Sequence, residues 1–292
     1  MKISTEIGSF SRRIGEERAI EYVARAGFDA WDFSMFRMVR ATDRATRQFE
    51  VTDHPLCGSG YLAYARELRK IGEDAGLVCN QSHAPFPTDI PKIRDLMKRS
   101  LEATAEAGGK ICVIHPGNRS SIEENAAFYG ELLPFAKGCG VKIATENMWC
   151  WNTELDQAEY AACSHHDEFL EYMETVNDPY FVACVDVGHA EMRGLRTSAP
   201  TMIRTLGKHV QALHLHDNDL WHDSHALPFT MQMDFPAILQ ALKDVGYTGE
   251  LTLEADRHLA TFDDDRIFDG VKEMADAARR LAAIYDGLKI SK

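Results

Sequence analysis

Five short apolar runs in this sequence each end on a side chain that can bind a metal ion. The five residues at these ends are Glu146, Asp186, His214, Glu254 and His115. Because a buried β-strand reads as such an apolar run, these side chains fall where strands are expected to stop. In a parallel barrel the strand ends converge on one face, where the active site lies. Carboxylates gathered there would repel one another unless a cation held them, so the pattern predicts a metal enzyme.

The segments that must position these side chains repeat a strand-then-helix pattern about every 36 residues. The expected strands are 2–7, 29–33, 77–82, 110–115, 141–147, 181–187, 210–216 and 250–255. Helix-like segments at 15–27, 60–75, 91–107, 121–139 and 234–245 each end at or beside a glycine, the residue that accommodates a left-handed cap. Strands that alternate with helices pair in parallel, and eight such units close into a (β/α)8 TIM barrel. Since no linker interrupts the pattern, we expect residues 1–292 to form a single domain.

The bulk composition narrows the class of protein. With 45% hydrophobic and 26% charged residues the chain is an ordinary globular protein, and a net charge of −13 offers no basic patch for nucleic acid. Seven cysteines with no C-x-x-C pair indicate buried small hydrophobes in a reducing compartment. Neither a signal-peptide hydrophobic region nor an apolar run of about 18 residues is present. We therefore expect a cytoplasmic protein without membrane association.

Several short motifs accompany the strand ends. They are Gln81-Ser82-His83-Ala84-Pro85, Ile114-His115-Pro116-Gly117, Thr145-Glu146-Asn147, Asp186-Val187-Gly188-His189, His214-Leu215-His216-Asp217-Asn218, Asp223-Ser224-His225 and Leu253-Glu254-Ala255. With them the chain resembles, over nearly its whole length, the xylose-isomerase-like barrel superfamily of sugar-phosphate isomerases and epimerases, which also holds apurinic-site endonucleases. Asp-x-x-His followed by His-x-His-Asp at the next strand is the most specific of these motifs.

The resemblance implies a set of site residues. In the epimerase branch it implies that Glu146, Asp186, His214 and Glu254 bind one divalent cation and that His189 contacts a substrate oxygen. Three carboxylates and one imidazole suit Mn²⁺, Mg²⁺ or Co²⁺, with Zn²⁺ as a further candidate. The endonuclease branch implies nine zinc ligands, which adds His83, His115, His189, Asp223 and His225. We expect His83, His115, His189 and His225 to line one pocket, on substrate oxygens or on extra metals.

The expected function is divalent-metal-dependent isomerisation or epimerisation of a small sugar or sugar derivative through an enediolate. Glu146 and Glu254 would exchange the carbon-bound proton, and the alternative for either is a purely ligating role. A dehydratase acting on a cyclic ketose such as an inosose would use the same enediolate. An apurinic-site endonuclease would need DNA-tracking loops, for which Arg37, Arg40, Arg44 and Arg47 are the only candidates, unless they form a solvated helix face. A non-catalytic binding protein is the remaining alternative.

Three departures from the relatives' patterns refine this expectation. The usual Gly-x-Gly turn after Asp223 and His225 is replaced by residues 227–231. The arginine and the glutamate that tagatose 3-epimerase relatives use on substrate would fall on Leu220 and Asn152, so a free-ketohexose 3-epimerase of that type is not expected.

Other details of the site stay open at this point. His216 shares a strand face with His214, and His214 is preferred as the ligand because the motif aligns there. The loops 34–57 and 148–163, the latter with Trp149 and Trp151, are expected as lids or substrate walls, with packing that merely caps the barrel as the alternative for the tryptophans. The expected partner is a small-molecule sugar, and a homo-oligomer that pairs through the outer helices is compatible with the fold.

Overall fold

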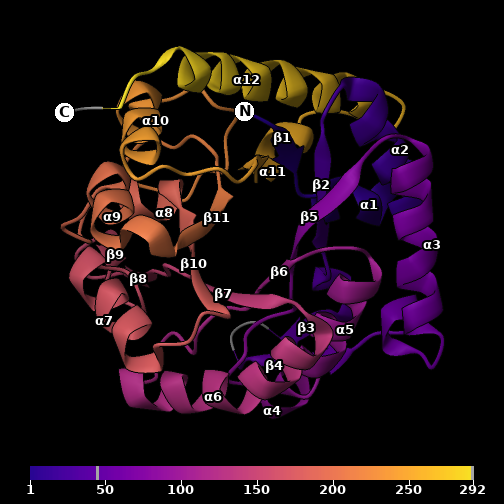
Figure 1. Cartoon of the computed structure of the whole chain (residues 1–292), viewed down its shortest axis with the longest axis horizontal. Helices are drawn as coiled ribbons and strands as arrows, with labels where there is room; N and C mark the ends of the chain where they lie inside the picture. The colour runs from indigo at the N-terminus through magenta and orange to yellow at the C-terminus, as the bar shows by residue number, and fades with distance from the viewer. Residues whose placement is uncertain (44–45, 291–292) are drawn as a thin grey trace.

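The computed structural model describes residues 1–43 and 46–290, and strands form a ring at its centre (Figure 1). The strands of the ring are β1 (Ile3–Thr5), β2 (Ala30–Ser34), β5 (Val78–His83), β6 (Ile111–Val113), β7 (Lys142–Glu146), β10 (Phe181–Asp186), β11 (Val210–His214) and β12 (Leu251–Leu253). Each overlaps one of the eight ranges expected from the apolar runs, and every pair of neighbours described by strand register is parallel.

Two isolated bridges close the ring. Six strands pair in the order β11, β10, β7, β6, β5 and β2, while β1 pairs with β12. A parallel bridge between Glu6 and Asp32 joins β1 to β2, and one between Leu215 and Leu253 joins β11 to β12. The barrel therefore closes on itself, and the expectation of a (β/α)8 TIM barrel is confirmed. Because the strands are parallel, their carboxyl ends lie on one face.

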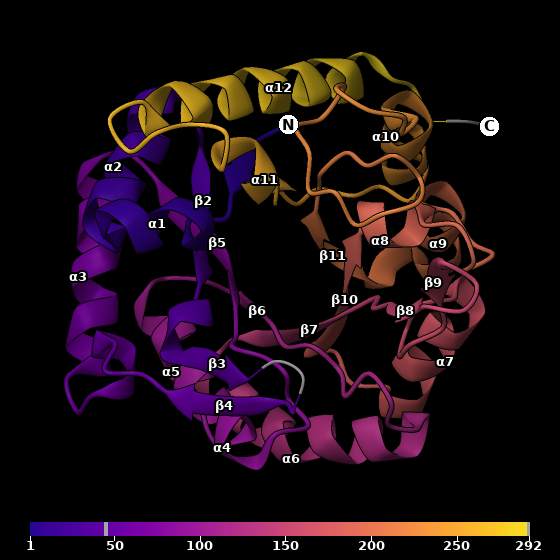
Figure 2. The ribbon, with the colours of Figure 1, turned by 180° about the vertical axis from the view of Figure 1, so that it is seen from behind.

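Helices surround the ring, as both views show (Figures 1 and 2). The longer ones are α2 (Glu16–Ala26), α3 (Tyr61–Asp74), α5 (Met97–Glu106), α6 (Ile122–Cys139), α7 (His166–Val176), α9 (Ala199–Leu206), α10 (Phe235–Asp244) and α12 (Ile267–Gly287). Short helices are α1 (Gly8–Ile14), α4 (Pro91–Arg94), α8 (Val187–Glu191) and α11 (Asp256–Leu259), with 3₁₀ turns η1 (Phe36–Met38), η2 (Pro55–Cys57) and η3 (Gly207–His209). The helix expected at 91–107 is divided into α4 and α5 by Asp95 and Leu96, both of which keep right-handed helical backbone angles.

The two long loops each fold into a β-hairpin. One consists of β3 (Val39–Asp43) and β4 (Gln48–Val51), and the other of β8 (Cys150–Asn152) and β9 (Gln157–Glu159). The helix-face interpretation is wrong for Arg40, which lies in the extended strand β3. Arg37 lies instead in the 3₁₀ turn η1, and Arg47 has a positive φ of 55° just before β4.

The arginines of the first hairpin region are engaged in ion pairs. Arg37 lies 2.8 Å from Glu16, Arg40 pairs with Glu50, and Arg47 lies 2.7 Å from Asp89. Arg44 lies outside the described residues.

The interior is divided by the strands into two apolar layers. The larger core lies between strands and helices and includes Trp31, Tyr129 and Phe169, all fully buried. A smaller cluster consists of Val113, Ala144, Val182, Cys184 and Ala212. Since side chains alternate along a strand, Ala144 shares the inner face of β7 with Glu146, so the smaller cluster lies beneath the site.

The described residues contain no helix that combines the length and apolar character needed to span a membrane.

Candidate active site

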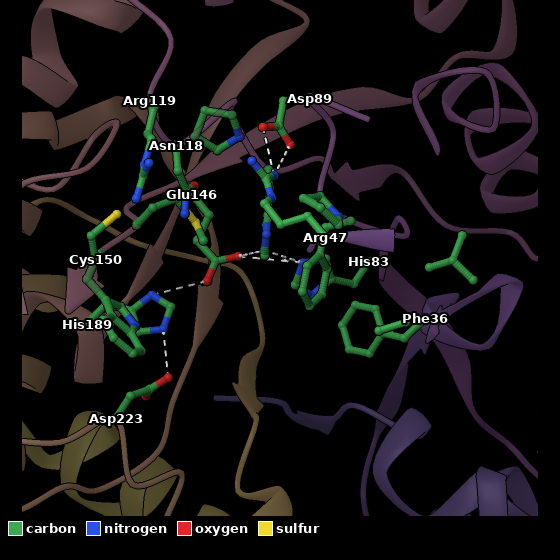
Figure 3. A pocket seen from close by; sticks show the side chains of 18 of the residues that line it. Phe36, Arg47, His83, Asp89, Asn118, Arg119, Glu146, Cys150, His189 and Asp223 are labelled. Atoms are coloured by element: carbon green, nitrogen blue, oxygen red, sulfur yellow. Dashed lines mark hydrogen bonds and ion pairs between the residues drawn. The ribbon is translucent and has the colours of Figure 1, made fainter. Parts of the chain in front are cut away.

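A cavity of about 840 Å³ lies at the carboxyl ends of the barrel strands (Figure 3). Its lining includes seven imidazole and carboxylate side chains that lie at or after the strand ends named above, namely His83, His115, Glu146, His189, Asp223, His225 and Glu254. The four histidines that the sequence grouped into one pocket therefore do lie in one cavity. Asp186 and His214 are fully buried and contact members of this set from below.

Glu146 is at the centre of the cluster. Its Oε2 lies 3.2 Å from Nε2 of His115 and 3.2 Å from Nδ1 of His214, and its Oε1 lies 3.6 Å from Nδ1 of His189. Burial by itself would raise the pKa of this carboxyl, but the imidazoles of His214 and His115 outweigh burial and hold the pKa well below its usual range. Glu146 is therefore a carboxylate throughout the neutral range.

His214 connects the two glutamates. Its Nδ1 lies 3.1 Å from Oε2 of Glu254 as well as 3.2 Å from Glu146, yet neither contact has hydrogen-bond geometry. A buried imidazole nitrogen facing two carboxylate oxygens without a hydrogen bond is the arrangement expected of three ligands that share a cation.

Asp186 ends β10 and begins α8. One carboxylate oxygen accepts the backbone N–H of His189 at 2.8 Å, while the other is buried without a hydrogen-bond partner among the described residues. Gly188 is required in this turn, because a Cβ there would lie 2.0 Å from the ring of His216. His216 in turn places Nε2 3.1 Å from Asp186. The Asp-x-Gly-His motif thus packs two imidazoles around one carboxylate.

A second group of ligand atoms lies around Asp223. Its Oδ2 is 3.4 Å from Nε2 of His189 and 3.1 Å from Nε2 of His225. Nδ1 of His189 lies 2.8 Å from the carbonyl of Asn147, and Nδ1 of His225 lies 2.8 Å from that of Glu254. Because a carbonyl only accepts, both Nδ1 atoms carry the proton, which leaves each Nε2 available to a metal or a substrate oxygen.

The donor sets fit a divalent cation. Ligand atoms of His83, His115 and Glu146 lie within 4.8 Å of one another, as do those of His83, His214 and Glu254, and those of His189, His216, Asp223 and His225. One carboxylate oxygen of Asp186 and Nδ1 of His214 are buried without a hydrogen-bond partner among the described residues, and this Nδ1 lies beside Glu146 and Glu254. Within the set predicted to hold one cation, Glu146 and Glu254 both contact Nδ1 of His214, whereas Asp186 contacts His216 and His189. The role of these four residues as one ligand set stays a prediction.

Glu254 differs from Glu146 in its protonation. Burial raises the pKa of Glu254 to about 8; His214 and His225 oppose the shift, and Glu146 and Asp186 add to it. Burial would lower the pKa of His214, but the neighbouring acidic groups of Cys184, Glu254 and Glu146 raise it well above its usual range. Two carboxyl groups with pKa values pushed apart are a pattern typical of acid–base catalysis.

Metal binding is consequently expected to release protons. At pH 7 the metal-free protein holds one proton on Glu254 and one on His214, and both must leave before these atoms can coordinate, so about two protons should be released per cation. The affinity for the cation should fall as the pH falls below about 8. Isothermal titration calorimetry in buffers of different ionisation enthalpy measures the release, and Glu254→Gln should lower it by about one proton. A binding heat independent of the buffer would contradict this expectation.

Asn118 and Arg119 were not singled out from sequence, and they line the cavity on the opposite side from Phe36 (Figure 3). Arg47, which the sequence suggested only for contacts with DNA, also lines the cavity and has Asp89 as its partner. The Asn-Arg pair directly follows the Ile114–Gly117 motif, which was the available signal.

The departures from the relatives' patterns have a structural counterpart. Leu220 and Asn152 do not line the cavity, and Asn152 instead donates to Glu159 within the β8–β9 hairpin. Of the two tryptophans, Trp149 lines the cavity, whereas Trp151 stacks on His222 with ring centroids 5.4 Å apart. The second hairpin is therefore a cavity wall through Trp149.

The fold and the site together define a metal-capable TIM barrel, and comparison with known proteins specifies it further. The family model described as xylose isomerase-like TIM barrel matches residues 20–284. The chain therefore belongs to this family, as its motifs indicated.

The relatives extend over most of the chain. An uncharacterized protein of Methanocaldococcus jannaschii is 24% identical over 260 residues, which cover 81% of this chain and 78% of that protein. Among solved structures, a D-tagatose 3-epimerase-like protein is 20% identical with a TM-score of 0.69 and covers 98% of this chain and 97% of its own. The 3-keto-D-glucoside 4-epimerase of E. coli is 16% identical with a TM-score of 0.62 and covers 87% of this chain and 91% of its own. At these identities the likeness shows the shared fold.

Proposed function

We propose that this protein is a divalent-metal-dependent isomerase or epimerase of a sugar derivative, acting through an enediolate. The observation that carries the proposal is the convergence of Glu146 and Glu254 on one unbonded nitrogen of His214 at the floor of the cavity. The structural neighbours named as sugar 3-epimerases and as a 4-epimerase support the reaction class. Seven free thiols support a reducing, cytoplasmic location.

The cation would be held by Glu146, Asp186, His214 and Glu254, with Mn²⁺, Mg²⁺ or Co²⁺ as the best match to three carboxylates and one imidazole, and Zn²⁺ as a further candidate. When bound, it would supply Lewis-acid polarisation that acidifies the hydrogen next to a substrate carbonyl. One of Glu146 and Glu254 takes that hydrogen as a proton, and the other returns one to the neighbouring carbon or to the opposite face. His189 and His225, each oriented by a backbone carbonyl, offer Nε2 to substrate oxygens.

Two alternatives remain distinguishable from this proposal. A dehydratase on a cyclic ketose would use the same residues and expel a hydroxyl group, so its product would have lost water. A multi-zinc apurinic-site endonuclease is favoured by one observation, the presence in one region of all nine counterpart ligands. Against it, Arg37, Arg40 and Arg47 are paired with carboxylates and are not free to follow a phosphate backbone.

The test of the proposal is hydrogen exchange with solvent. We expect the metal-loaded wild type to introduce deuterium from D₂O at a carbon of the substrate, because a carboxylate base shares its proton with water between turnovers. Nuclear magnetic resonance or mass spectrometry of ketoses and keto-glycosides incubated in D₂O measures it, and chelated protein serves as the control. Product formation without any exchange would point to hydride transfer between adjacent carbons and reject the enediolate.

A further inference from the structure

The cavity is larger than one sugar ring requires. Its volume of about 840 Å³ lies in the upper part of the range of about 300–1,000 Å³ found for pockets that enclose drug-sized ligands. The groups that could exchange a proton with substrate occupy the floor of this space. A substrate that fills the cavity therefore extends well beyond the reacting carbons.

One wall of the cavity is aromatic. Phe36, in η1, contacts His83 edge-on with centroids 4.6 Å apart, and Phe86 stacks on His115 at 4.6 Å with an interplanar angle of 28°. Phe36 and Phe86 meet edge to face at 5.2 Å. Phe49 of β4 also lines the cavity. The wall thus begins at two imidazoles beside Glu146 and continues outward to the β3–β4 hairpin.

Phe86 is the residue of this wall whose exposure points to contact with a ligand. Its side chain is on the surface of the protein, with 40% of the residue exposed, in contrast to the fully buried Trp31 and Phe33 of the core. Exposed aromatic surface in a concave site is typical of ligand contact. A planar apolar group could stack on the Phe86 ring without any change in the backbone.

The remaining polar lining is sparse. Among the described residues that line the cavity, the polar side chains other than those of the metal-capable group and the thiol of Cys150 are Arg47, Asp89, Asn118 and Arg119. Arg47 and Asp89 are paired with each other at 2.7 Å. A free ketohexose, with a hydroxyl on nearly every carbon, would find Asn118 and Arg119 on one side. On the other side it would meet Phe36 and an arginine that is already paired with Asp89 (Figure 3).

We propose that the substrate is a glycoside, in which the reacting sugar ring carries an aromatic or similarly planar apolar group. The sugar ring lies over Glu146 and Glu254, and the apolar group packs against Phe36 and Phe86. This inference rests on the proposed function for the placement of the sugar ring, while the aromatic subsite rests on the cavity wall alone. The apolar group contributes binding that a free sugar cannot obtain here.

The experiment is a comparison of binding that requires no turnover. Phenyl and methyl glucopyranosides, both anomers of each, are titrated into the metal-loaded protein by calorimetry or by ligand-observed nuclear magnetic resonance. We expect the phenyl glycoside of the preferred anomer to bind about ten- to hundred-fold more tightly than its methyl counterpart, because it buries a ring against an aromatic wall. Phe86→Ala should remove most of this difference and leave the methyl glycoside within about twofold.

A matched control and the contradicting results complete the test. Tyr160→Ala removes an aromatic side chain that is 51% exposed and does not line the cavity, so it should leave both affinities unchanged. Equal affinities for phenyl and methyl glycosides, or a tenfold difference that survives Phe86→Ala, would overturn the aromatic subsite. Tighter binding of a sugar phosphate than of either glycoside would also overturn the aromatic subsite. That result would indicate that Arg119 binds a phosphate group in the outer cavity. Phenyl-selective binding without any solvent exchange in keto-glycosides would reject the proposed reaction and retain the subsite.

Discussion

Replacement of Glu254 or Glu146 by glutamine should reduce solvent exchange at the substrate carbon by about 10²–10⁴-fold, the usual contribution of one general base. Glutamine keeps an oxygen that can face the cation but cannot accept the carbon-bound proton. Glu254, with a pKa of about 8, and Glu146, with a pKa well below its usual range, provide one group of each protonation state at neutral pH in the metal-free protein. The measurement is deuterium incorporation per unit time in D₂O.

Glu6→Gln is the matched control for these two variants. Glu6 is also a buried glutamate at the end of a barrel strand, and its Oε2 accepts the backbone N–H of Ser9 and the hydroxyl of Ser34, but it does not line the cavity. Its exchange rate should remain that of the wild type. Metal content must be measured in every variant, because a lost ligand would otherwise resemble a lost base. Undiminished exchange in both Glu146→Gln and Glu254→Gln, with metal bound, would contradict their role as bases.

The strand ends could be predicted because local patterns determine them. A buried parallel strand is a continuous apolar run, and the first polar residue after it must lie on the carboxyl face of the barrel. Glu146, Asp186 and His214 each end a strand, and Glu254 directly follows one. Once the barrel closes, these positions are brought together whatever the loops do, which is why their convergence could be anticipated.

The different roles of His214 and His216 could be assigned only from the structure. Both imidazoles are fully buried, but β11 ends at His214, and His216 follows two residues later. His214 faces Glu146 and Glu254, whereas His216 lies 3.1 Å from Asp186 and packs over Gly188. These partners come from other strands, so no spacing within 210–216 could separate the two roles.

The cavity walls could not be predicted for the same reason. The β3–β4 hairpin was expected only as a long loop because its strands are short and polar, and β3 is mostly exposed, so no apolar run marks it. Phe36, Phe49 and Phe86 are far apart in sequence and form a wall only when the hairpin lies beside the segment after β5. The floor of the site is thus a property of the barrel, and the walls are a property of long-range packing.

The second large effect that we expect is a loss of metal binding when one of the four predicted ligands is replaced. Loss of a residue that only hydrogen-bonds to a metal ligand typically lowers metal affinity about 10–100-fold. We expect a larger loss of affinity for the divalent cation when a direct ligand is replaced by alanine, as in variants of Glu146, Asp186, His214 or Glu254. His214→Ala removes the one nitrogen of the set, and its loss leaves Glu146 and Glu254 facing each other without an intervening imidazole. Metal content after dialysis, measured by elemental analysis, reports the result.

Two controls make this measurement specific. Glu191→Ala removes a carboxylate from the same α8 segment as His189, outside the cavity, and should keep the full metal content. His165→Ala breaks an outer group formed with His166 and Asp167, and so accounts for any cation bound there. About one cation per wild-type chain is expected of the epimerase-like set. Three zinc ions would favour the endonuclease-like set, which adds His83, His115, His189, Asp223 and His225. Near-stoichiometric metal in two or more of the four alanine variants would show that the cation is held by other residues. The proposed roles of Glu146 and Glu254 as bases beside a bound cation would then have to be rejected.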